Sequence, residues 1–457
     1  MQIQMCDEGE ENNTKLQRRI EVLGIIQNII EESEEPIIME ELIGKVLEKG
    51  KKAKVASLII QRKTTQQKNE ALLAIAEQLN KDRQAIFEAN EKDMQNGKAN
   101  GIEVNVLDRI LLTDERMDAI IEALEQCVNL YDPIGDELEN IKRQDGLHII
   151  KKRVPIGVIG IIYEARPNVT IDAAMLCIKT NNAVILRGSS SAIESNKALV
   201  ASIQTALQTV DFPIDSVQLI EDTSRETAKT LFTLNEYLDV LIPRGSQQLI
   251  NTVVKNATVP VIETGAGNCH IYIDAAANYE KAISIVKNAK LQRPSVCNAC
   301  ESLLVHEKVI EQYGKSLIQE LLAENIEIFG DEHICSLSQE VVPATNDHYA
   351  EEFLRLALSI KVVHSVEEAI NHIHQYGTKH SEAIITEDYE NAQFFLQNVD
   401  AAAVYHNAST RFTDGFEFGY GAEIGISTQK LHARGPMGLE ALTSSKYFIF
   451  GDGHIRS

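Results

Sequence analysis

Short apolar runs alternate with helix-length segments from residue 154 onward, and this alternation limits the fold more than any other feature of the sequence. The first runs, rich in β-branched residues, occupy 158–163, 183–187, 217–220, 239–243 and 259–263. Amphipathic segments such as 170–179 and 195–208 separate them. Strands separated by helices of about 10 to 15 residues indicate βαβ units, in which helices cover both faces of a parallel sheet. The sequence therefore predicts an α/β lobe of the kind that commonly binds nucleotides.

A second series of the same kind follows, at 302–306, 360–363, 383–386 and 402–405. A compact core stops growing at about 250 to 300 residues. A chain of 457 residues is therefore expected to form two or three domains. We predict two parallel-sheet lobes. Outside both series, 148–153 and 446–450 also have the pattern of strands.

Residues 1–41 differ from the rest of the chain because they are acidic. Within them, five apolar residues recur at helical spacing: Leu16, Ile20, Leu23, Ile26 and Ile30. We expect an acidic amino-terminal extension that is partly helical. A second helix is expected near Thr64, because Gln67 three residues later completes the pattern of a capping box.

The overall composition argues against several classes of partner. The 44 Lys plus Arg against 67 Asp plus Glu give a formal charge of -23, which disfavours nucleic acid and anionic lipid as partners. No stretch approaches the run of about 18 apolar residues that spans a membrane, and the amino terminus is too polar for a secretory signal. The seven cysteines are odd in number and scattered, which disfavours a disulfide framework. A cytoplasmic protein with free thiols is expected.

The segment QRPSVCNAC at 292–300 holds the strongest candidates for chemistry, Cys297 and Cys300. A zinc half-site would need a second pair such as His372 and His374, but these two lie in a helical pattern. A thioredoxin-like redox pair would lie at a helix start in a small domain, whereas this pair is deep inside a large chain. A single catalytic thiolate and two buried, inert thiols remain open on nearly equal terms.

Glycines and hydroxyl residues follow several of the predicted strands. Residues 261–274 place Glu263 and two close glycines between two strands, where a tight turn and a close approach to a ligand fit equally well. The loops 186–191 and 243–246 can offer N–H groups, hydroxyls and guanidinium groups to phosphate at helix N-termini. No Gly-x-Gly-x-x-Gly follows a strand, so the dinucleotide fingerprint gives no support.

Several longer motifs resemble those of one enzyme family. They are YEARPNVT at 163–170, QRPSVCNAC at 292–300, NASTRF at 407–412, GAEIGIST at 421–428 and LHARGPMGL at 431–439. Taken in order, they resemble the γ-glutamyl phosphate reductases, or glutamate-5-semialdehyde dehydrogenases, of the aldehyde dehydrogenase superfamily. The resemblance extends over about residues 42–457 and leaves out the acidic extension.

The resemblance implies an aldehyde-dehydrogenase-like α/β fold with two parallel-sheet lobes. The cofactor-binding domain is expected at 42–270 and the catalytic domain at 271–437. A small β oligomerisation arm is expected from 138–155 with 440–457, which implies a homo-oligomer. Hydride transfer would take place between the lobes.

The activity that the resemblance implies is an oxidoreductase reaction: NADPH reduces L-glutamyl 5-phosphate to L-glutamate 5-semialdehyde and phosphate, the second step of proline biosynthesis from glutamate. Cys297 matches the family nucleophile and would hold the glutamyl group as a thioester, whereas Cys300 falls where the family needs no thiol. A free cysteine is mostly protonated at neutral pH, and Arg293 is a candidate source of the charge that favours the thiolate.

The backbone N–H of Cys297 and the side-chain amide of Asn168 are expected to stabilise the oxyanion. Glu263 lies where hydrolytic aldehyde dehydrogenases carry a base. An efficient base would let water reach the acyl enzyme before hydride, so Glu263 is expected to be structural or orienting.

The cofactor residues also follow from their positions in the matching segments: Arg187, Gly188 and Ser189 for the adenosine ribose and phosphate, Gly245 and Ser246 for the pyrophosphate, and Glu352 for the nicotinamide ribose. A cationic Arg187 is compatible with a 2'-phosphate, which favours NADPH over NADH.

The substrate residues are expected to be arginines with neighbouring hydroxyls. Arg411, with Ser409 and Thr410, would bind the α-carboxylate, and Arg166 or Arg293 would receive the leaving phosphate. Salt bridges between the lobes are the alternative role for these arginines. No metal is expected.

Two other functions stay open. A hydrolytic aldehyde dehydrogenase that oxidises a semialdehyde would use the same cysteine, and a non-catalytic sensor would bind NADPH without turnover. No kinase domain is recognised, which argues against the fused synthase that performs both steps. A transient contact with a separate glutamate 5-kinase is expected instead.

Overall fold

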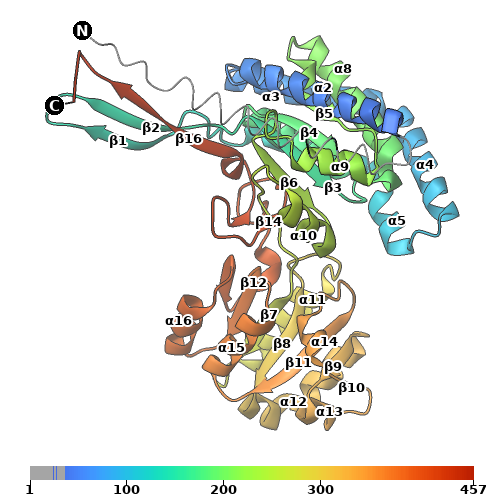
Figure 1. Ribbon diagram of the computed structural model, residues 1–457. Helices are drawn as coiled ribbons and strands as arrows, with labels where there is room; N and C mark the ends of the chain where they lie inside the picture. The colour runs from blue at the N-terminus through green and yellow to red at the C-terminus, as the bar shows by residue number, and fades with distance from the viewer. Residues whose placement is uncertain (1–23, 25–26, 28–35, 457) are drawn as a thin grey trace. The chain divides into compact units, whose positions relative to one another are not determined.

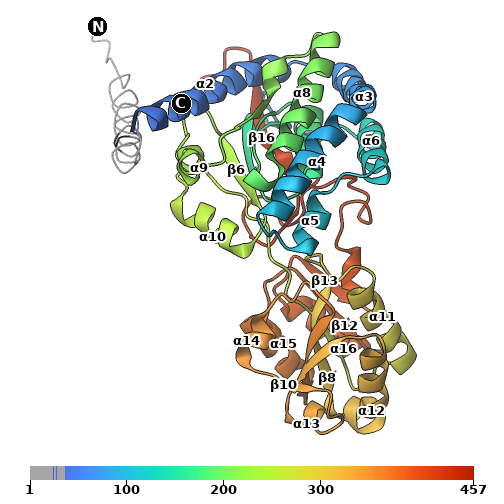
Figure 2. The same cartoon turned by 90° about the vertical axis from the view of Figure 1, so that its right-hand side faces the viewer.

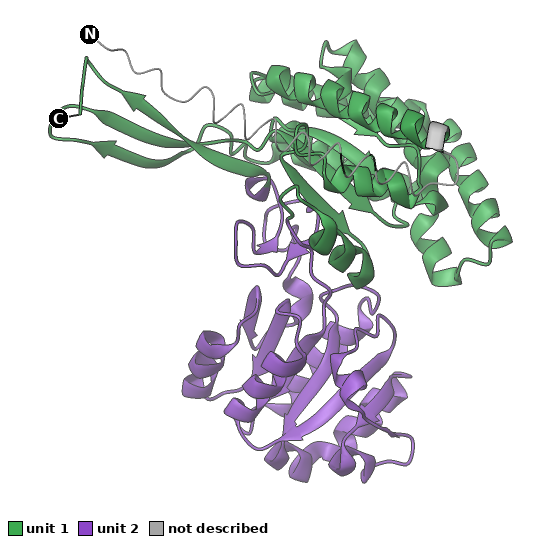
Figure 3. Ribbon diagram, viewed as in Figure 1, with its two compact units in different colours: residues 1–261, 442–457 green, residues 262–441 purple. Residues whose placement is uncertain are grey.

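The computed structural model describes residues 24, 27 and 36–456. The chain forms two compact units, one built from Met1–Val261 with Leu442–Ser457 and the other from Ile262–Ala441 (Figure 3). The five apolar residues of the amphipathic helix expected within 16–30 lie outside the described residues. Among the helices that are described, none is long and apolar enough to cross a membrane. The assignment of cofactor binding and catalysis to separate domains stays a prediction.

The first unit contains a four-stranded parallel sheet (Figure 1). Its strands, in the order β5-β4-β3-β6, are β5 (Val217–Leu219), β4 (Ala183–Arg187), β3 (Val158–Tyr163) and β6 (Val240–Arg244). All six residues of β3 are buried, as expected of a strand covered on both faces. The chain runs outward from β3 to β5 and returns beside β3 for β6. This reversal creates a switch point at the carboxyl ends of β3 and β6, where ligands of such sheets commonly bind.

Helices cover this sheet (Figure 2). Those between the strands are α7 (Asn168–Lys179), α8 (Ile193–Thr209), α9 (Arg225–Phe232) and α10 (Gln247–Asn256), and the preceding ones are α2 (Pro36–Ile60), α3 (Thr65–Lys81), α4 (Arg83–Ala99), α5 (Val104–Ile110) and α6 (Asp114–Asn129). The capping box is confirmed at the start of α3: the Thr64 hydroxyl accepts from the Gln67 N–H, and the Thr64 N–H donates to the Gln67 side chain.

The strand predicted at 259–263 is wrong. Only one isolated bridge forms there, between Leu241 and Val261. Pro260 lies inside the run and has no N–H, so it cannot donate to a ladder, although its carbonyl accepts from the Leu241 N–H at 2.8 Å. The segment therefore ends as an irregular connection into the second unit.

A three-stranded antiparallel sheet completes the first unit. It consists of β1 (Glu137–Lys142), β2 (His148–Pro155) and β16 (Thr443–Phe450), with β2 in the centre (Figure 1). Both strand patterns recognised at 148–153 and 446–450 are confirmed. Large apolar side chains such as Tyr447 and Ile449 are exposed on β16. The role of this arm in oligomerisation stays a prediction.

The second unit contains a seven-stranded parallel sheet in the order β10-β9-β11-β8-β7-β12-β13. The strands are β7 (Cys269–Ile273), β8 (Cys300–His306), β9 (Glu327–Gly330), β10 (Val342–Pro343), β11 (Ala357–Val363), β12 (Ser381–Ile385) and β13 (Ala403–His406), and a separate small hairpin pairs β14 (Ile426–Ser427) with β15 (Gly435–Pro436). The four runs of the second series lie on β8, β11, β12 and β13, which confirms this lobe. The short strands β9 and β10 were not predicted.

Alternating side chains place helices on both faces of the second sheet. Ile271 and Ile273 of β7 pack into one core with α11 (Tyr279–Leu291) and α12 (Glu307–Ala323). Tyr272 faces the other way, into a core with α15 (Val366–Tyr376) and α16 (Tyr389–Asn398). The short helices α13 (Glu332–Cys335) and α14 (Asn346–Ala350) lie beside β9, where Ile334 of α13 packs in the core with Ile328 and His348 of α14 stacks on Phe329. Because parallel strands all start on the same side of a sheet, the segments just before β7, β8, β11 and β12 are brought together at the amino-terminal ends of these strands.

Candidate active site

The two cysteines of the motif at 292–300 lie in different environments. Cys297 is partly exposed in the loop between α11 and β8. Cys300 is the first residue of β8, is fully buried, and donates to the Ser302 carbonyl at 3.4 Å. Burial raises the pKa of the Cys300 thiol to about 12. Since the thiolate is the reactive form of a cysteine, these environments favour Cys297 over Cys300 as the candidate nucleophile.

The backbone of Cys297 lies against the segment that leads into β7. The Cys269 thiol donates to the Cys297 carbonyl oxygen at 3.2 Å. A Cβ placed on Gly267 would lie 1.4 Å from that same oxygen, so only glycine permits this approach. Gly267 therefore packs against another backbone, whereas the two interpretations left open, a tight turn and a close approach to a ligand, stay predictions.

Asn298, which was not among the predicted site residues, joins the loop of Cys297 to residues 409–413. Its side-chain amide donates to the Thr413 carbonyl at 2.9 Å and to the Arg411 carbonyl at 3.3 Å. The backbone carbonyl of Asn298 accepts from the Thr410 hydroxyl at 2.7 Å. Asn298 is buried. A polar residue directly after a candidate nucleophile, in a motif otherwise leading into a buried strand, was the signal that could have identified it.

The arginine proposed for the α-carboxylate is held beside this loop. The Arg411 guanidinium donates from Nε to Gln292 Oε1 at 2.8 Å and from Nη1 to Asn298 Oδ1. Burial lowers the pKa of Arg411, whereas the charges of Asp414 and of ionised Cys297 raise it. Arg293 is exposed. Arg411 is thus a second cation, beside the expected Arg293, that can favour the thiolate.

The two hydroxyls expected to assist Arg411 are engaged within the loop. Thr410 is fully buried and donates to Asn298, and Ser409 is nearly buried and accepts from the Arg411 N–H at 3.3 Å. Their hydrogen bonds hold the turn at Thr410–Phe412 (η3). Of the three expected carboxylate ligands, Arg411 alone is a partly exposed charged group.

Glu352 and Glu263 lie in irregular segments of the second unit. Glu352 Oε1 accepts from the Gly267 N–H at 2.7 Å, next to the loop of Cys297. This leaves Oε2 to accept from a hydroxyl such as that of a ribose. The Glu263 N–H donates to Gln429 Oε1 at 2.8 Å, which fixes its backbone.

In the first unit, Gly245 and Ser246 follow β6 at the switch point, and Ser246 is the N-cap of α10. The Ser246 N–H donates to Glu164 Oε2 at 2.7 Å and its hydroxyl to Oε1 at 3.1 Å. A Cβ on Gly245 would lie 2.5 Å from Glu164 Oε2. The carboxylate therefore occupies the place at the helix N-terminus that a phosphate would take, and the donors fit an anion.

Arg187, Gly188 and Ser189 lie at the carboxyl end of β4, next to that end of β3. Arg187 Nη2 donates to the Thr223 and Ser224 carbonyls at 2.6 and 3.0 Å, and burial lowers the pKa of the guanidinium. Among the described atoms, buried Arg187 Nε and Asn196 Nδ2 have no acceptor. A Cβ on Gly188 would lie 2.2 Å from Asn196 Nδ2. Two orphaned donors around a bare glycine fit the ribose and phosphate oxygens of a dinucleotide.

Asn168 begins α7, two residues after Arg166 in the loop that follows β3. Its Nδ2 donates one hydrogen to Asp172 Oδ2 at 2.9 Å, which orients the amide and leaves the other hydrogen available. Burial raises the pKa of Asp172 to about 6. The structure therefore separates the expected residues: Asn168 belongs to the first unit, and Cys297 and Arg411 to the second.

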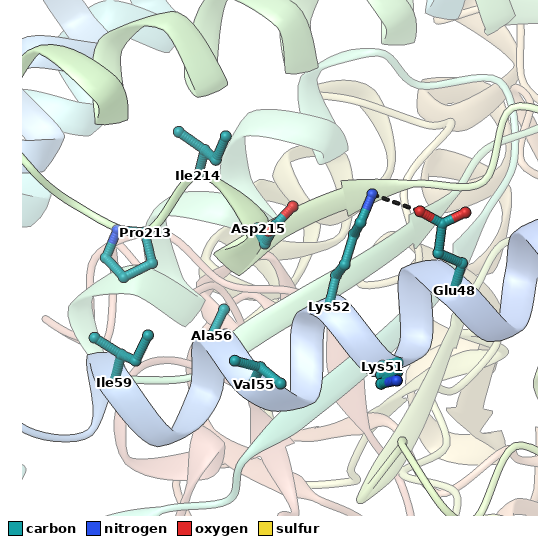
Figure 4. A pocket seen from close by; sticks show the side chains of 9 residues that line it. All are labelled: Glu48, Lys51, Lys52, Val55, Ala56, Ile59, Pro213, Ile214 and Asp215. Carbon is teal, nitrogen blue, oxygen red and sulfur yellow. Dashed lines mark ion pairs between the residues drawn. The ribbon is translucent and has the colours of Figure 1, made fainter.

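A surface groove of about 480 Å³ lies on the first unit between α2 and the turn Ile214–Ser216 (η2). Val55, Ile59 and Ile214 line it, and Lys52 pairs with Glu48 at 2.7 Å at its rim (Figure 4). None of the predicted site residues lines this groove. Within the part of the chain that is described, no group of three or more His, Cys, Asp or Glu residues is arranged to hold a metal ion.

Comparison with known proteins gives three consistent findings. A model of the aldehyde dehydrogenase family matches residues 40–332. Gamma-glutamyl phosphate reductase 1 of Bacillus licheniformis is 59% identical over 414 residues, which are 91% of this chain and 100% of that protein. The gamma-glutamyl phosphate reductase of Bacillus subtilis is 60% identical over 408 residues, 89% of this chain and 98% of the relative.

Among solved structures, the crystal structure of gamma-glutamyl phosphate reductase from Thermotoga maritima matches with a TM-score of 0.88 and 48% identity, over 90% of this chain and 100% of that one. An acetylating aldehyde dehydrogenase from Geobacillus thermoglucosidasius, 16% identical, matches with a TM-score of 0.65 over 91% of this chain and 98% of that one, a likeness of fold.

Proposed function

The chain belongs to the aldehyde dehydrogenase family, alongside its γ-glutamyl phosphate reductases, and from this premise we propose that it reduces L-glutamyl 5-phosphate to L-glutamate 5-semialdehyde and phosphate with NADPH. The predicted aldehyde-dehydrogenase-like fold is confirmed by the same likeness, and the chain is an oxidoreductase. The proposed reaction is the second step from glutamate to proline.

The observation that carries the proposal is the environment of Cys297. Its thiol is the accessible one of the motif pair, and its loop is tied through Asn298 to the loop of Arg411. In the proposed sequence, the Cys297 thiolate attacks the acyl carbon and the C–O bond to phosphate breaks. A thioester results. A nearby guanidinium favours the thiolate that this attack requires.

Negative charge develops on the carbonyl oxygen when the thioester forms and again when it is reduced. The Cys297 N–H and the free hydrogen of the Asn168 amide are the proposed donors, and one such donor is typically worth about 3 kcal/mol. Asp172 supports this role because it holds the other hydrogen of the amide. Glu263 is proposed to orient its segment and not to activate water.

NADPH, when bound, supplies the hydride. We propose that Arg187, Gly188 and Ser189 contact its adenosine ribose and phosphate, Gly245 and Ser246 its pyrophosphate, and Glu352 its nicotinamide ribose. The orphaned Arg187 Nε supports this assignment, and its charge favours the 2'-phosphate of NADPH over NADH. Arg411 is proposed to bind the α-carboxylate, and Arg166 or Arg293 to receive the phosphate.

The reaction can be tested in the direction of semialdehyde oxidation. Purified protein should reduce NADP with glutamate 5-semialdehyde only when inorganic phosphate is present, because phosphate must attack the thioester to release the product. NAD in place of NADP tests cofactor preference. Equal rates without phosphate would instead assign a hydrolytic aldehyde dehydrogenase, and NADPH binding without any turnover would assign a sensor.

Two cysteine variants test the nucleophile. Cys297→Ala should abolish turnover, and the matched variant Cys300→Ala should keep most of it, because Cys300 is buried and its pKa is raised. Substantial turnover by Cys297→Ala would remove the basis of the mechanism.

We further propose that the arm formed by β1, β2 and β16 pairs two subunits. The exposed Tyr447, Ile449 and Phe450 on β16 support this because such side chains are rarely left in water together. Sedimentation of the wild type against Tyr447→Ser/Ile449→Ser tests the oligomer.

A partly exposed reactive thiol also favours a reducing compartment, so we place the protein in the cytoplasm. Contact with glutamate 5-kinase stays a prediction.

A further inference from the structure

A fully buried ion pair joins the two ends of the loop that carries Cys297. Lys290 lies in the last turn of α11 and Glu301 is the second residue of β8, so residues 291–300 run between them. Lys290 Nζ and Glu301 Oε2 are 2.5 Å apart, and both side chains are fully buried. A buried ion pair rarely stabilises a fold more than apolar residues of the same size would. A role other than stability is therefore worth testing for this pair.

The second oxygen of Glu301 binds a different segment. Glu301 Oε1 accepts from the Leu354 N–H at 3.2 Å. Leu354 has a φ of 53°, in the left-handed region that a leucine rarely adopts. Such a conformation persists where the surroundings hold it, and it is common at functional sites. Glu301 is one of the groups that hold it.

The held turn includes Glu352, two residues before Leu354. Glu352 accepts from the Gly267 N–H at 2.7 Å, and Gly267 lies directly against the Cys297 carbonyl. The contacts of Glu301, Leu354, Glu352 and Gly267 thus lead back to the loop of Cys297. Lys290 and Glu301 fix the ends of that loop, and Glu301 also fixes the turn that presents Glu352.

We propose that Lys290 and Glu301 are positioning residues that set Glu352 for the nicotinamide ribose and hold it in register with Cys297. The proposal rests on the function proposed above, in which Glu352 contacts that ribose. Lys290 neutralises and orients the Glu301 carboxylate, and Glu301 acts through the Leu354 N–H.

Double variants separate positioning from folding. Removal of one partner alone would leave a buried charge and destabilise the protein. Lys290→Met/Glu301→Leu removes both charges and the acceptor for the Leu354 N–H. Lys290→Met/Glu301→Gln also removes both charges but keeps an amide oxygen that can accept from it. Lys281→Met/Glu387→Gln, which removes an exposed pair that also involves α11, is the control.

The dissociation constant of NADPH is measured by its fluorescence, and thermal unfolding of each variant is followed by circular dichroism. We expect the Leu variant to bind NADPH about tenfold more weakly, as for the loss of one hydrogen bond to a charged group. The Gln variant should recover most of the affinity, and the control should match the wild type. The rate at which iodoacetamide alkylates Cys297 without cofactor should differ from the wild-type rate most in the Leu variant and less in the Gln variant. In the control it should equal the wild-type rate.

Equal NADPH dissociation constants for the Leu and Gln variants would overturn the proposal. If the Leu variant does not fold, Lys290→Leu/Glu301→Met replaces it, since Leu and Met have similar volumes. The outcome is independent of the substrate: a wild type that binds NADPH but fails the phosphate-dependence assay would refute the proposed function and leave the positioning test intact.

Discussion

Gly267→Ala should disable the enzyme without touching a reactive group. A Cβ at this position would lie 1.4 Å from the Cys297 carbonyl oxygen, 2.3 Å from its carbonyl carbon and 2.8 Å from its Cα. Since Cβ atoms are essentially never found within 3.0 Å of another heavy atom, the two backbones must separate by about 1.6 Å, the difference between 3.0 and 1.4 Å. The clash is with backbone, so no rotamer change relieves it.

The displacement affects the loop of Cys297, the proposed nucleophile, because other contacts hold both backbones in place. Gly267 is bound to Glu352 through its N–H, and Asn298 anchors the loop of Cys297 to residues 409–413. A misplacement of about 1 Å at a reacting centre costs about 100-fold in rate. We therefore expect kcat to fall by at least about 100-fold.

The assay is phosphate-dependent NADP reduction, combined with the alkylation rate of Cys297 and circular dichroism. Gly265→Ala is the matched variant, because its Cβ would meet the Thr428 side chain, which can turn aside. Gly44→Ala, where nothing lies within 4 Å, is the neutral control. A folded Gly267→Ala enzyme with wild-type kcat and thiol reactivity would refute the reasoning.

Three further variants test neighbouring features. Glu164→Gln should lower the KM for NADP about fivefold, since it removes a charge that competes with phosphate for the Ser246 N–H; an unchanged or raised KM would contradict this competition. Burial raises the pKa of Asp172 to about 6 from its ordinary 3.8, so the folded state loses stability as pH rises through that interval. Asp172→Asn should abolish this pH dependence. Parallel curves of unfolding temperature for the wild type and the variant, recorded from about pH 4 to 8, would refute the reasoning. Asn298→Ala should raise the KM for the semialdehyde about tenfold by releasing Arg411, and an unchanged KM would exclude that route.

Hydrophobic pattern was sufficient to identify the two parallel sheets. The run at 158–163 became β3 with the same bounds, since its side chains are buried on both faces. The run at 259–263 looked similar, but the missing N–H of Pro260 prevents a ladder there. The strands β9 and β10 were missed because their sequences, EIFG and VP, contain no run of three apolar residues and end in glycine and proline.

A motif can indicate a candidate reactive group, as it does for Cys297, but it cannot indicate supporting residues whose contacts are distant in sequence. Lys290 and Glu301 look like ordinary charged residues, and only the fold shows that they bury each other. The occupation of the Thr410 hydroxyl by Asn298 could not be read from the motif NASTRF either. Which side chains pair or are buried depends on strand register and packing, and neither can be read from a single sequence.

The central position of β2 in the arm has a consequence for biosynthesis. One side of β2 pairs with β1, which is close by in sequence. The other side pairs with β16, whose Thr443 lies opposite Pro155. Since chains fold as they emerge from the ribosome, that edge stays unpaired throughout translation of the whole second unit. Until the residues of β16 have been translated, the growing chain thus exposes an open strand edge to chaperones and proteases.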